Sequence, residues 1–562
     1  MKLRSIAGFL TALVPVLAGG GFDAALKPAP APKTIRVIVE FRAGAMKAGE
    51  AALAARGARP VSRLPLVNSA AYEIRRSQLE SFAALPSVEW IHDDAAMHET
   101  MDVVRATTGA VTANKSGWTG KGIGVAVIDS GITQHPDLND ASGATRVRYF
   151  QTFGVETVMQ DVYGHGTHVA GIIGGRGTMS TGSAYKKTYR GIAPEAHFVS
   201  LAPLNRYGQG TESAVIAAIQ KAIDLQSTYN IKVMNLSLGK PVSKPYTQDL
   251  LCKAVEAAWK KGIVVVVAAG NEGRNNSAHN SGYGTITSPA NDPYVITVGA
   301  TRTMGTATKA DDLVATYSSK GPTRFDRIVK PDLVAPGNHV ASLLSQDGRF
   351  RNTNRENCVV LSDYMNGAIA QPGDQYFWMS GTSMAAPVVS GAVALMWHKA
   401  AVEKKTLTPD LIKMRLMKTA WKGFPLEGTG KDTAGVTYHV RHDIFTVGAG
   451  YLDIGAALDN TDTATTLALS PKAVVNSDGE VVLKDPVSGV GVVWGDNATW
   501  SYRTVWGTSN IVDDTGVIWG DGVIWGDSTM AGFGVIWGDG VIWGDSTQVT
   551  GETDALLLKG DQ

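Results

Sequence analysis

The sequence is poor in cysteine, in long hydrophobic runs and in any excess of one charge. Its 562 residues include only two cysteines, Cys252 and Cys358, so no disulfide framework holds the fold together. The sequence alone does not decide whether these two cysteines form one disulfide bridge. Beyond the N-terminus no run reaches 18 apolar residues, which argues against an integral membrane protein. The net charge of +1 gives no electrostatic reason to expect nucleic acid as a partner.

What the chain does have is enough apolar sequence for several domains. Hydrophobic residues make up 44% of it, which is ample for a large core. Residues 1–20 join two basic residues to an apolar stretch and then small residues, an arrangement typical of a signal peptide, with a buried N-terminal helix as the alternative. We therefore expect a secreted protein, either extracellular or associated with the cell surface.

Two changes of pattern divide the remaining chain. Over 30–99, strand-like runs such as TIRVIVEF alternate with helical stretches, which predicts a small α+β domain. Over 100–460, apolar runs such as 263–268 lack polar alternation and are separated by helical stretches. This pattern predicts an α/β domain with a largely parallel sheet and helices on both faces. Its functional residues should gather beyond the carboxyl ends of the strands.

The region 461–562 has a different composition. The stretch GVIWGDGVIWGDST occurs twice, from Gly516 and from Gly534, and seven of the 13 tryptophans lie between Trp494 and Trp543. VIW triplets on both sides of GDG indicate β-hairpins, and a stacked solenoid with a six-residue period is the alternative. We expect a β-rich repeat tail that serves as a structural appendage, binds a surface or self-associates.

Ser383 lies in GTSMAAP, at the start of a long apolar run that indicates a buried helix. A helix start presents unpaired N–H groups and a partial positive charge, which stabilise negative charge that develops nearby. A serine that only caps the helix is the common alternative. A nucleophilic serine would need a histidine, a carboxylate and oxyanion donors from elsewhere in the chain.

Three other positions can supply those groups. Asp129 ends the strand run in GVAVIDSG, and His165 lies between two glycines in YGHGTHVAG. The neighbouring His168 raises the question of a metal, but the spacing is not that of a zinc peptidase. Asn271 follows a buried strand in VVVVAAGNEG, where its amide could donate to an oxyanion or merely cap a turn. Each signal alone is weak, and Asp129 alone could be a structural carboxylate.

Seven motifs together resemble the subtilisin-like serine peptidases, the subtilase family. They are AVIDSGI, HGTHVAG, NLSLG, AAGNEG, YSSKGP, KPDLVAPG and GTSMAAP, and the resemblance spans about 100–460. It implies a triad of Asp129, His165 and Ser383 with Asn271 as oxyanion donor, and it implies that 30–99 is an inhibitory propeptide. The Asp, His, Ser order is known for this family, whereas in α/β-hydrolase esterases the serine comes first.

The resemblance also implies substrate-binding residues and raises the question of calcium. The residues expected to contact an extended peptide are Gly208, Gln209, Gly210, Ser237, Leu238, Gly239, Gly270 and Thr287. None of them is charged, which favours an apolar or aromatic substrate side chain. Asp137 in HPDL matches a position that often binds calcium, but the loop at 174–191 that would share the ion departs from the family pattern. We assign no metal ligand and expect no cofactor for the chemistry.

The sequence thus predicts a secreted serine endopeptidase that is made as a self-processing precursor. Its partners would be extended polypeptide substrates and its own propeptide, which would act as an intramolecular inhibitor. The alternative is a non-catalytic adhesive or scaffold protein that retains the fold. A long stretch between Pro336 and Ser380 exceeds what the simplest family members have, and it could shape the cleft or a neighbouring loop.

Overall fold

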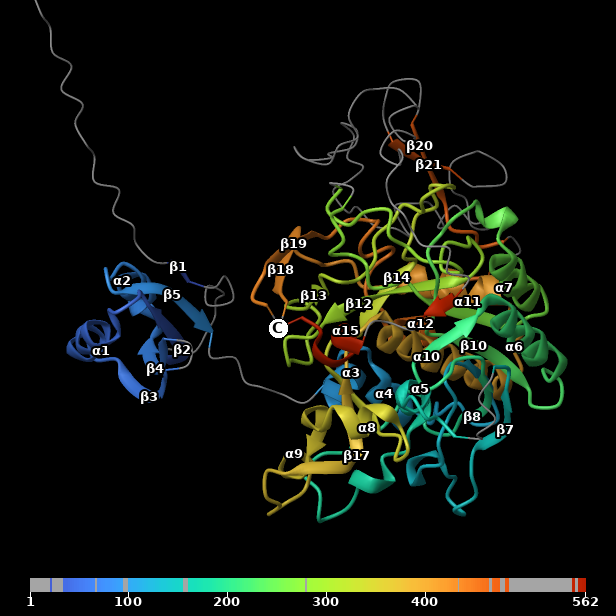
Figure 1. The fold of residues 1–562 in the computed structure, drawn as a ribbon, viewed down its shortest axis with the longest axis horizontal. Helices are drawn as coiled ribbons and strands as arrows, with labels where there is room; N and C mark the ends of the chain where they lie inside the picture. Colours follow the sequence, from blue (N-terminus) through green and yellow to red (C-terminus); the bar gives the residue numbers. More distant parts are fainter. Residues whose placement is uncertain are drawn as a thin grey trace, which may run out of the picture. The chain divides into compact units, whose positions relative to one another are not determined.

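The computed structural model describes residues 21–22, 34–65, 68–93, 100–154, 160–277, 280–432, 434–463, 467–475, 481–484, 548–550 and 554–561 (Figure 1). Contacts divide the chain into two compact units, Met1–Met97 and His98–Gln562. This division falls close to residue 99, where we expected the first domain to end. The expected signal peptide at 1–20 and both tryptophan-rich repeats lie outside the described residues.

The first unit is a five-stranded sheet with two helices, in the strand order β1-β5-β2-β4-β3. Its elements are β1 (Gly21–Phe22), β2 (Thr34–Phe41), α1 (Met46–Ala55), β3 (Arg59–Leu64), β4 (Ser69–Arg75), α2 (Leu79–Ala83) and β5 (Val88–Asp93). Alternate residues of β2, including Val37, Val39 and Phe41, are buried, as the period of two of a half-buried strand requires. They pack in one core with Leu53 of α1 and Phe82 of α2.

An eight-stranded sheet forms the centre of the second unit, in the order β13-β12-β11-β10-β6-β8-β7, with β14 also paired to β12. The strands are β6 (Gly124–Ile128), β7 (Val147–Thr152), β8 (His197–Ala202), β10 (Ile231–Leu236), β11 (Val264–Ala268), β12 (Ile296–Arg302), β13 (Leu313–Val314) and β14 (Leu333–Pro336). Every pairing except β12 with β13 is parallel. The structure therefore confirms the predicted α/β domain.

Helices cover the sheet in two pairs. Helices α5 (His165–Gly174) and α10 (Thr382–Val402) contact each other, and so do α6 (Glu212–Asp224) and α7 (Leu250–Lys260). Helix α10 contacts five strands of the sheet, and apolar residues surround it, which explains its lack of a polar face. It is also the one described helix long and apolar enough to cross a membrane, but most of it is buried inside this domain.

Smaller elements surround this centre. They are α3 (Thr100–Thr107), α4 (Ala110–Lys115), β9 (Gln209–Thr211), β15 (Val340–Leu343), α8 (Arg349–Thr353), β16 (Cys358–Val360), α9 (Leu361–Tyr364), β17 (Pro372–Met379), α11 (Pro409–Thr419), β18 (Glu427–Lys431), β19 (Thr437–Arg441), α12 (Ile454–Asp459), β20 (Lys472–Val475), β21 (Val481–Lys484), β22 (Gln548–Thr550) and α15 (Asp554–Lys559). The long stretch before Ser380 thus forms an antiparallel sheet of β15, β17 and β16 with two short helices. Cys252 in α7 and Cys358 in β16 are both buried and free.

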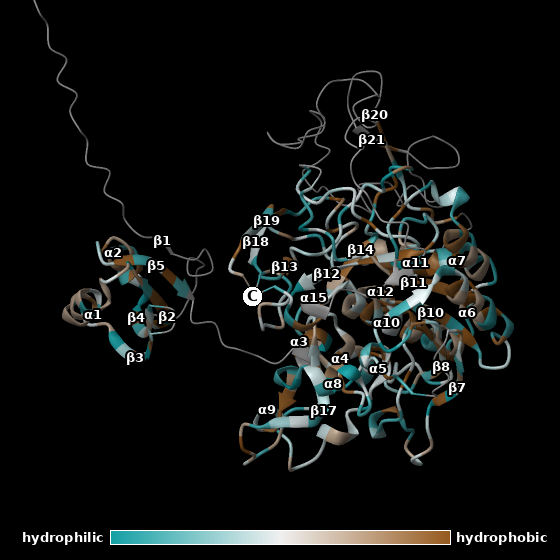
Figure 2. Ribbon diagram, viewed as in Figure 1, coloured by the Kyte–Doolittle hydropathy of each residue, from teal (hydrophilic) through white to brown (hydrophobic). Residues whose placement is uncertain are grey.

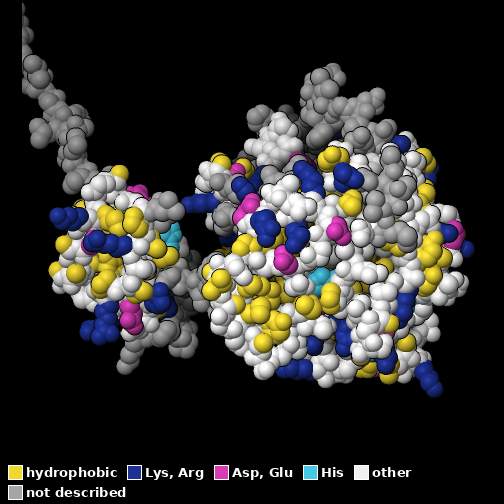
Figure 3. Space-filling view, turned by 60° about the horizontal axis from the view of Figure 1, so that its bottom comes forward, with side chains coloured by type: hydrophobic (Ala, Val, Ile, Leu, Met, Phe, Trp, Pro, Cys, Tyr) yellow, Lys and Arg dark blue, Asp and Glu magenta, His cyan; other side chains and the backbone are white. Residues whose placement is uncertain are grey.

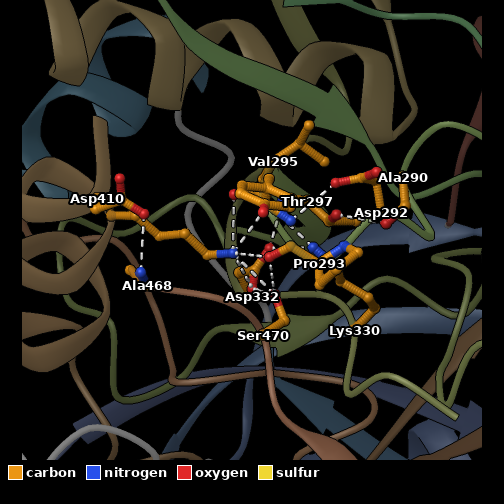
Figure 4. A network of polar contacts seen from close by, with 12 residues as sticks. Ala290, Asp292, Pro293, Val295, Thr297, Lys330, Asp332, Asp410, Ala468 and Ser470 are labelled. Carbon is orange, nitrogen blue, oxygen red and sulfur yellow. Dashed lines mark hydrogen bonds and ion pairs between the residues drawn. The ribbon is translucent and has the colours of Figure 1, made fainter. Parts of the chain in front are cut away.

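A buried ion network ties the chain beyond residue 460 to this domain (Figure 4). Asp332 pairs with Lys330 at 2.7 Å and with Lys413 of α11 at 3.3 Å, and all three side chains are fully buried. The Ser470 hydroxyl donates to Asp332 at 2.5 Å, and Leu469 beside it is also buried. The domain boundary that we expected at residue 460 therefore falls inside the second unit, because residues 469 and 470 still pack into its core.

Apolar and charged residues are distributed differently over the fold. In Figure 2, brown apolar stretches lie along strands and helices of both units, and teal hydrophilic stretches occur on loops and on helices. On the face shown in Figure 3, basic and acidic side chains are interspersed rather than collected in a patch of one sign.

Candidate active site

The proposed catalytic residues meet at one edge of the central sheet. Asp129 directly follows β6, Ser237 follows β10, and Asn271 lies just beyond β11. These three strands are parallel neighbours, so their carboxyl ends lie side by side. The fold therefore brings Asp129, Ser237 and Asn271 to the same edge of the sheet.

Asp129 and His165 form a buried hydrogen-bonded pair. The Nδ1 atom of His165 lies 2.7 Å from Oδ1 of Asp129, and the exposed fractions of the two side chains are 2% and 0%. The backbone N–H of Ser130 donates to the same oxygen at 2.8 Å. A carboxylate that accepts from Nδ1 fixes the imidazole tautomer in which Nε2 can accept a proton.

Close backbone contact places His165 at the start of α5. Gly164 has a φ of +107°, a conformation that favours glycine, and it directly precedes the helix. At Gly166, an added Cβ would lie only 2.1 Å from the carbonyl oxygen of Gly131. The two glycines therefore let the start of α5 approach the loop that carries Asp129.

Asp161 is a second buried carboxylate at this site, which the sequence analysis did not single out. Its Oδ1 accepts hydrogen bonds from Gly164 N at 2.7 Å and Ser130 Oγ at 2.8 Å, and its Oδ2 accepts from both N and Oγ1 of Thr167. Burial raises the pKa of Asp161, against the effect of these hydrogen bonds. Its position four residues before His165, in DVYGH, was the available signal.

His168 has a structural role. Its Nε2 lies 3.1 Å from the Val340 carbonyl oxygen and 3.0 Å from that of Phe377, so this nitrogen carries the proton and donates. Burial lowers the pKa of His168 to about 3. An imidazole held between two carbonyl groups ties α5 to β15 and β17, so His168 is not a candidate base.

Ser383 is the second residue of α10 and is buried to 1% exposure. Its hydroxyl donates to the Ser237 carbonyl oxygen at 3.1 Å, and the Ser237 hydroxyl donates to the Ser383 carbonyl oxygen at 3.0 Å. These reciprocal bonds attach the start of α10 to the end of β10. The structure thus places Ser383 at the same sheet edge as Asp129 and Asn271.

Asn271 is oriented by Thr382, a contact that the sequence analysis missed. Its Oδ1 accepts hydrogen bonds from the backbone N of Thr382 at 3.0 Å and from Oγ1 at 3.1 Å. Its Nδ2 is buried, and no partner for it occurs among the described residues. A buried donor without an acceptor costs free energy of folding. Such a donor is expected at a site where its acceptor is the oxyanion of a reaction intermediate.

The eight expected substrate-binding residues fall into two groups. Thr287 lies against both Gly239 and Gly270, because an added Cβ would come within 2.6 Å and 2.8 Å of it at these two positions. Ser237 and Leu238, both buried, adjoin this group in the chain. In the second group, Gly208 packs on the Tyr163 ring near His165, followed by Gln209 and Gly210 in β9.

The long stretch before Ser380 supports the histidine loop. The ring centroid of Phe350 lies 4.6 Å from that of Tyr163, and the Arg349 backbone N–H donates to the Val162 carbonyl at 2.9 Å. Gly164 also lies against Phe350. The stretch therefore packs against the loop that ends at His165. Shaping a neighbouring loop is one of the two roles that we expected for this stretch.

Asp137, the expected calcium position, is already satisfied by the protein. Its Oδ1 accepts from Met179 N and its Oδ2 accepts from the Tyr376 hydroxyl, both at 2.8 Å. The guanidinium of Arg146 donates to the carbonyl oxygens of residues 137, 139, 174 and 196. A divalent cation at Asp137 would have to displace the tyrosine and lie beside a buried arginine, so the residues present do not fit the ion.

The described residues also contain no cluster of three or more His, Cys, Asp or Glu side chains that could hold a metal. The pKa of Arg146 is lowered to about 10 by burial, so the guanidinium remains charged at neutral pH. Its positive charge is thus available to the backbone carbonyl groups that a cation would otherwise bind.

Comparisons with known proteins show which family the chain resembles. A model of the subtilase family matches residues 120–450. The chain is 34% identical to serine protease AprX of Bacillus subtilis (strain 168) over 406 residues, covering 69% of this chain and 84% of that protein. It is 32% identical to subtilisin E of the same strain over 369 residues, covering 65% and 78%, and 30% identical to an alkaline protease of Shouchella clausii over 330 residues, covering 58% and 68%.

Proposed function

The chain belongs to the subtilase family and is a serine endopeptidase, and from this premise we propose that Asp129, His165 and Ser383 form its catalytic triad. The buried hydrogen bond between Asp129 Oδ1 and His165 Nδ1 is the observation that carries the proposal. Support also comes from the position of Ser383 at a helix start beside the same sheet edge.

In this mechanism His165 accepts the proton of the Ser383 hydroxyl as the oxygen attacks the substrate carbonyl, and later delivers it to the leaving amine. Asp129 keeps the imidazole in the required tautomer and stabilises its charged form. The Nδ2 group of Asn271 and the backbone N–H of Ser383 donate to the oxyanion. Water then hydrolyses the acyl-enzyme through the same groups.

Substrate would bind as an extended strand between two backbone edges, at Gly208–Gly210 and at Ser237–Gly239. The primary pocket would lie at Gly270 and Thr287. Neither residue is charged, which favours an apolar or aromatic side chain on the substrate.

We propose that the enzyme is secreted through its N-terminal signal peptide and that the 30–99 region is an inhibitory propeptide. The compact fold of the first unit, with its own core, supports a separately folding segment. Cleavage near residues 98–101 would depend on Ser383. The tryptophan-rich repeats would bind a surface or self-associate.

The chemistry would need no cofactor, and the packing around Asp137 supports a fold that needs no calcium at that position.

The test is hydrolysis of casein and of a short chromogenic peptide by the purified wild type and by Ser383→Ala and His165→Ala variants. Each variant should lose essentially all activity, and the double variant should lose little more, because the triad acts as a unit. Hydrolysis that persists in Ser383→Ala would reject the triad. Absence of Ser383-dependent hydrolysis in the mature wild type would favour a non-catalytic scaffold.

A further inference from the structure

The 554–561 segment packs beside the proposed active site. The Ser380 backbone N–H, three residues before Ser383, donates to the Leu557 carbonyl oxygen at 2.7 Å. Leu557 and Leu558 are both buried, and Asn357 donates to the Leu558 carbonyl. Hence the strand-to-helix junction that carries Ser383 also holds this distant segment.

Asp561 occupies a site formed by three separate segments. Its carboxylate accepts hydrogen bonds from N and Oγ1 of Thr316 at 2.7 Å and 2.6 Å, and it pairs with Arg274. Asn338 exchanges two hydrogen bonds with the Asp561 backbone, at 2.8 Å and 3.0 Å. The carboxylate is only 1% exposed, and Arg274 lies three residues after Asn271. This geometry is that of a binding site for an acidic residue.

Gly560 fits this site without room for a side chain. Its φ is +57°, and an added Cβ would lie 2.3 Å from both Ser380 Oγ and Asn338 Oδ1. Close shape matching at Gly560, together with the buried ion pair at Asp561, distinguishes the contact from loose association of a surface segment.

A second part of the same chain end covers the expected substrate edge. Strand β22 pairs antiparallel with β9, with Val549 opposite Gly210 and Thr550 opposite Gln209. The other side of Gln209 is turned to a loop, where its carbonyl accepts from Asn205 N at 2.8 Å. Because only one edge of β9 is open, only one peptide at a time can pair with it. Strand β22 occupies this edge.

We propose that the tail segment, defined as β22 together with 554–561, is an intramolecular inhibitor that competes with substrate for the cleft. The inference rests on the proposed function, because it requires β9 to be a substrate edge. A ligand tethered to the same chain binds intramolecularly at a raised effective concentration, so even weak docking raises KM. Since the tail segment competes for binding rather than altering the triad, kcat is unaffected.

The test uses the full chain with Asp561→Ala, and Asp459→Ala as a matched control. Asp459 is an 86% exposed carboxylate of α12, so its loss should change nothing. Asp561→Ala should lower KM for a peptide long enough to pair with β9 by about tenfold at unchanged kcat, since a lost charge-assisted hydrogen bond weakens docking by about that factor. An unchanged or raised KM in a variant that melts like the wild type would overturn the proposal.

A second experiment covers the case in which Asp561→Ala does not fold. A cleavage site for a specific protease is inserted between residues 485 and 547, and the folded protein is cut there, which leaves every described contact of the tail segment in place. Once the tether is cut, gel filtration should separate the segment from the enzyme, and the KM of the enzyme should fall. A synthetic peptide of residues 548–561 should raise KM again by competing with substrate, whereas a scrambled peptide should not. Activity lost on release would show instead that the tail segment is a structural part of the enzyme.

These outcomes are separable from failure of the proposed function. If the wild type shows no hydrolysis that depends on Ser383, the catalytic assignment itself fails. If hydrolysis depends on Ser383 but neither Asp561→Ala nor release of the segment lowers KM, only the inhibitory role is rejected.

Discussion

Oδ1 of Asn271 accepts two hydrogen bonds from Thr382, one from its backbone N at 3.0 Å and one from its hydroxyl at 3.1 Å. Because the amide oxygen is held in this way, Nδ2 must point in the opposite direction. Thr382 directly precedes Ser383, so the residue next to the nucleophile orients the proposed oxyanion donor. The two halves of the oxyanion site are thus positioned by one contact.

The first prediction concerns this donor. Asn271→Ala should lower kcat by about 10²- to 10³-fold with little change in KM, because the oxyanion exists only in the transition state and the intermediate. The magnitude is that of another subtilase rather than one obtained from this geometry. Steady-state kinetics on a short peptide measure it, with Thr382→Ser, which keeps the hydroxyl, as the near-normal control. Unchanged turnover in Asn271→Ala would exclude Asn271 from the oxyanion site.

The second prediction concerns Asp161, which accepts four hydrogen bonds around the histidine loop. Asp161→Asn replaces one acceptor oxygen with an NH₂ group that faces N–H or O–H donors. A buried polar mismatch of this kind should cost about 1–3 kcal/mol of unfolding free energy, measured by urea titration. Ser142→Ala in the same unit, where the exposed hydroxyl donates to Asp140 Oδ1, serves as the control. Wild-type stability in Asp161→Asn would contradict the account of this loop.

The third prediction concerns the buried network in Figure 4. Asp332→Asn removes the carboxylate that pairs with both Lys330 and Lys413, leaving two buried lysines without their nearest counter-charge. The expected loss of unfolding free energy is about 3–5 kcal/mol. Lys405→Ala breaks an exposed pair with Glu403 and should cost less than about 1 kcal/mol. Similar losses in the two variants would show that burial does not determine the strength of these pairs.

The fourth prediction is a pH dependence of stability. Burial raises the pKa of Asp443 from 3.8 to about 6, although hydrogen bonds from the Tyr283 hydroxyl and Phe445 N and the nearby charge of Lys320 act against this. The folded protein therefore holds the Asp443 proton more tightly than the unfolded chain. The resulting stability is present below about pH 4 and is lost as the pH rises through about 6.

Asp443→Asn cannot ionise, so it should lack this loss. Between about pH 4.5 and 7, the unfolding free energy of the wild type should fall relative to that of Asp443→Asn by about 1–3 kcal/mol. Burial lowers the pKa of Lys320 to about 8, so this lysine stays mostly protonated over this range in the wild type. Parallel stability profiles for the two proteins would refute the assignment.

The fifth prediction concerns calcium. Because Tyr376 and Met179 already satisfy the Asp137 carboxylate, EDTA should not change the melting temperature of the wild type through this position. Tyr376→Phe removes one donor and should lower the melting temperature without creating a requirement for calcium. A fall in melting temperature with EDTA that Asp137→Asn abolishes would show that an ion does bind there.

The sequence was sufficient to propose Asp129, His165, Asn271 and Ser383, because each signal is local and the seven motifs together resemble one family. A strand that ends in a polar residue, or a helix that starts beside glycines, is visible within about ten residues of chain. The parallel sheet followed for the same reason, since its buried strands are uninterrupted apolar runs such as β11. The position of the four residues at one sheet edge is a consequence of that topology.

Only the tertiary structure determined which distant groups complete the site. Thr382 meets Asn271 across 111 residues, Tyr376 meets Asp137 across 239, and Arg274 meets Asp561 across 287. The sequence pattern contains no signal for such pairs, because hydrophobic period and turn residues report only on neighbouring positions. The contacts form because the sheet and α10 first bring these segments together, and the buried polar groups must then find partners there. For that reason the sequence by itself was enough to propose the catalytic residues, whereas the satisfied Asp137 carboxylate and the docked tail segment were determined by the folded chain.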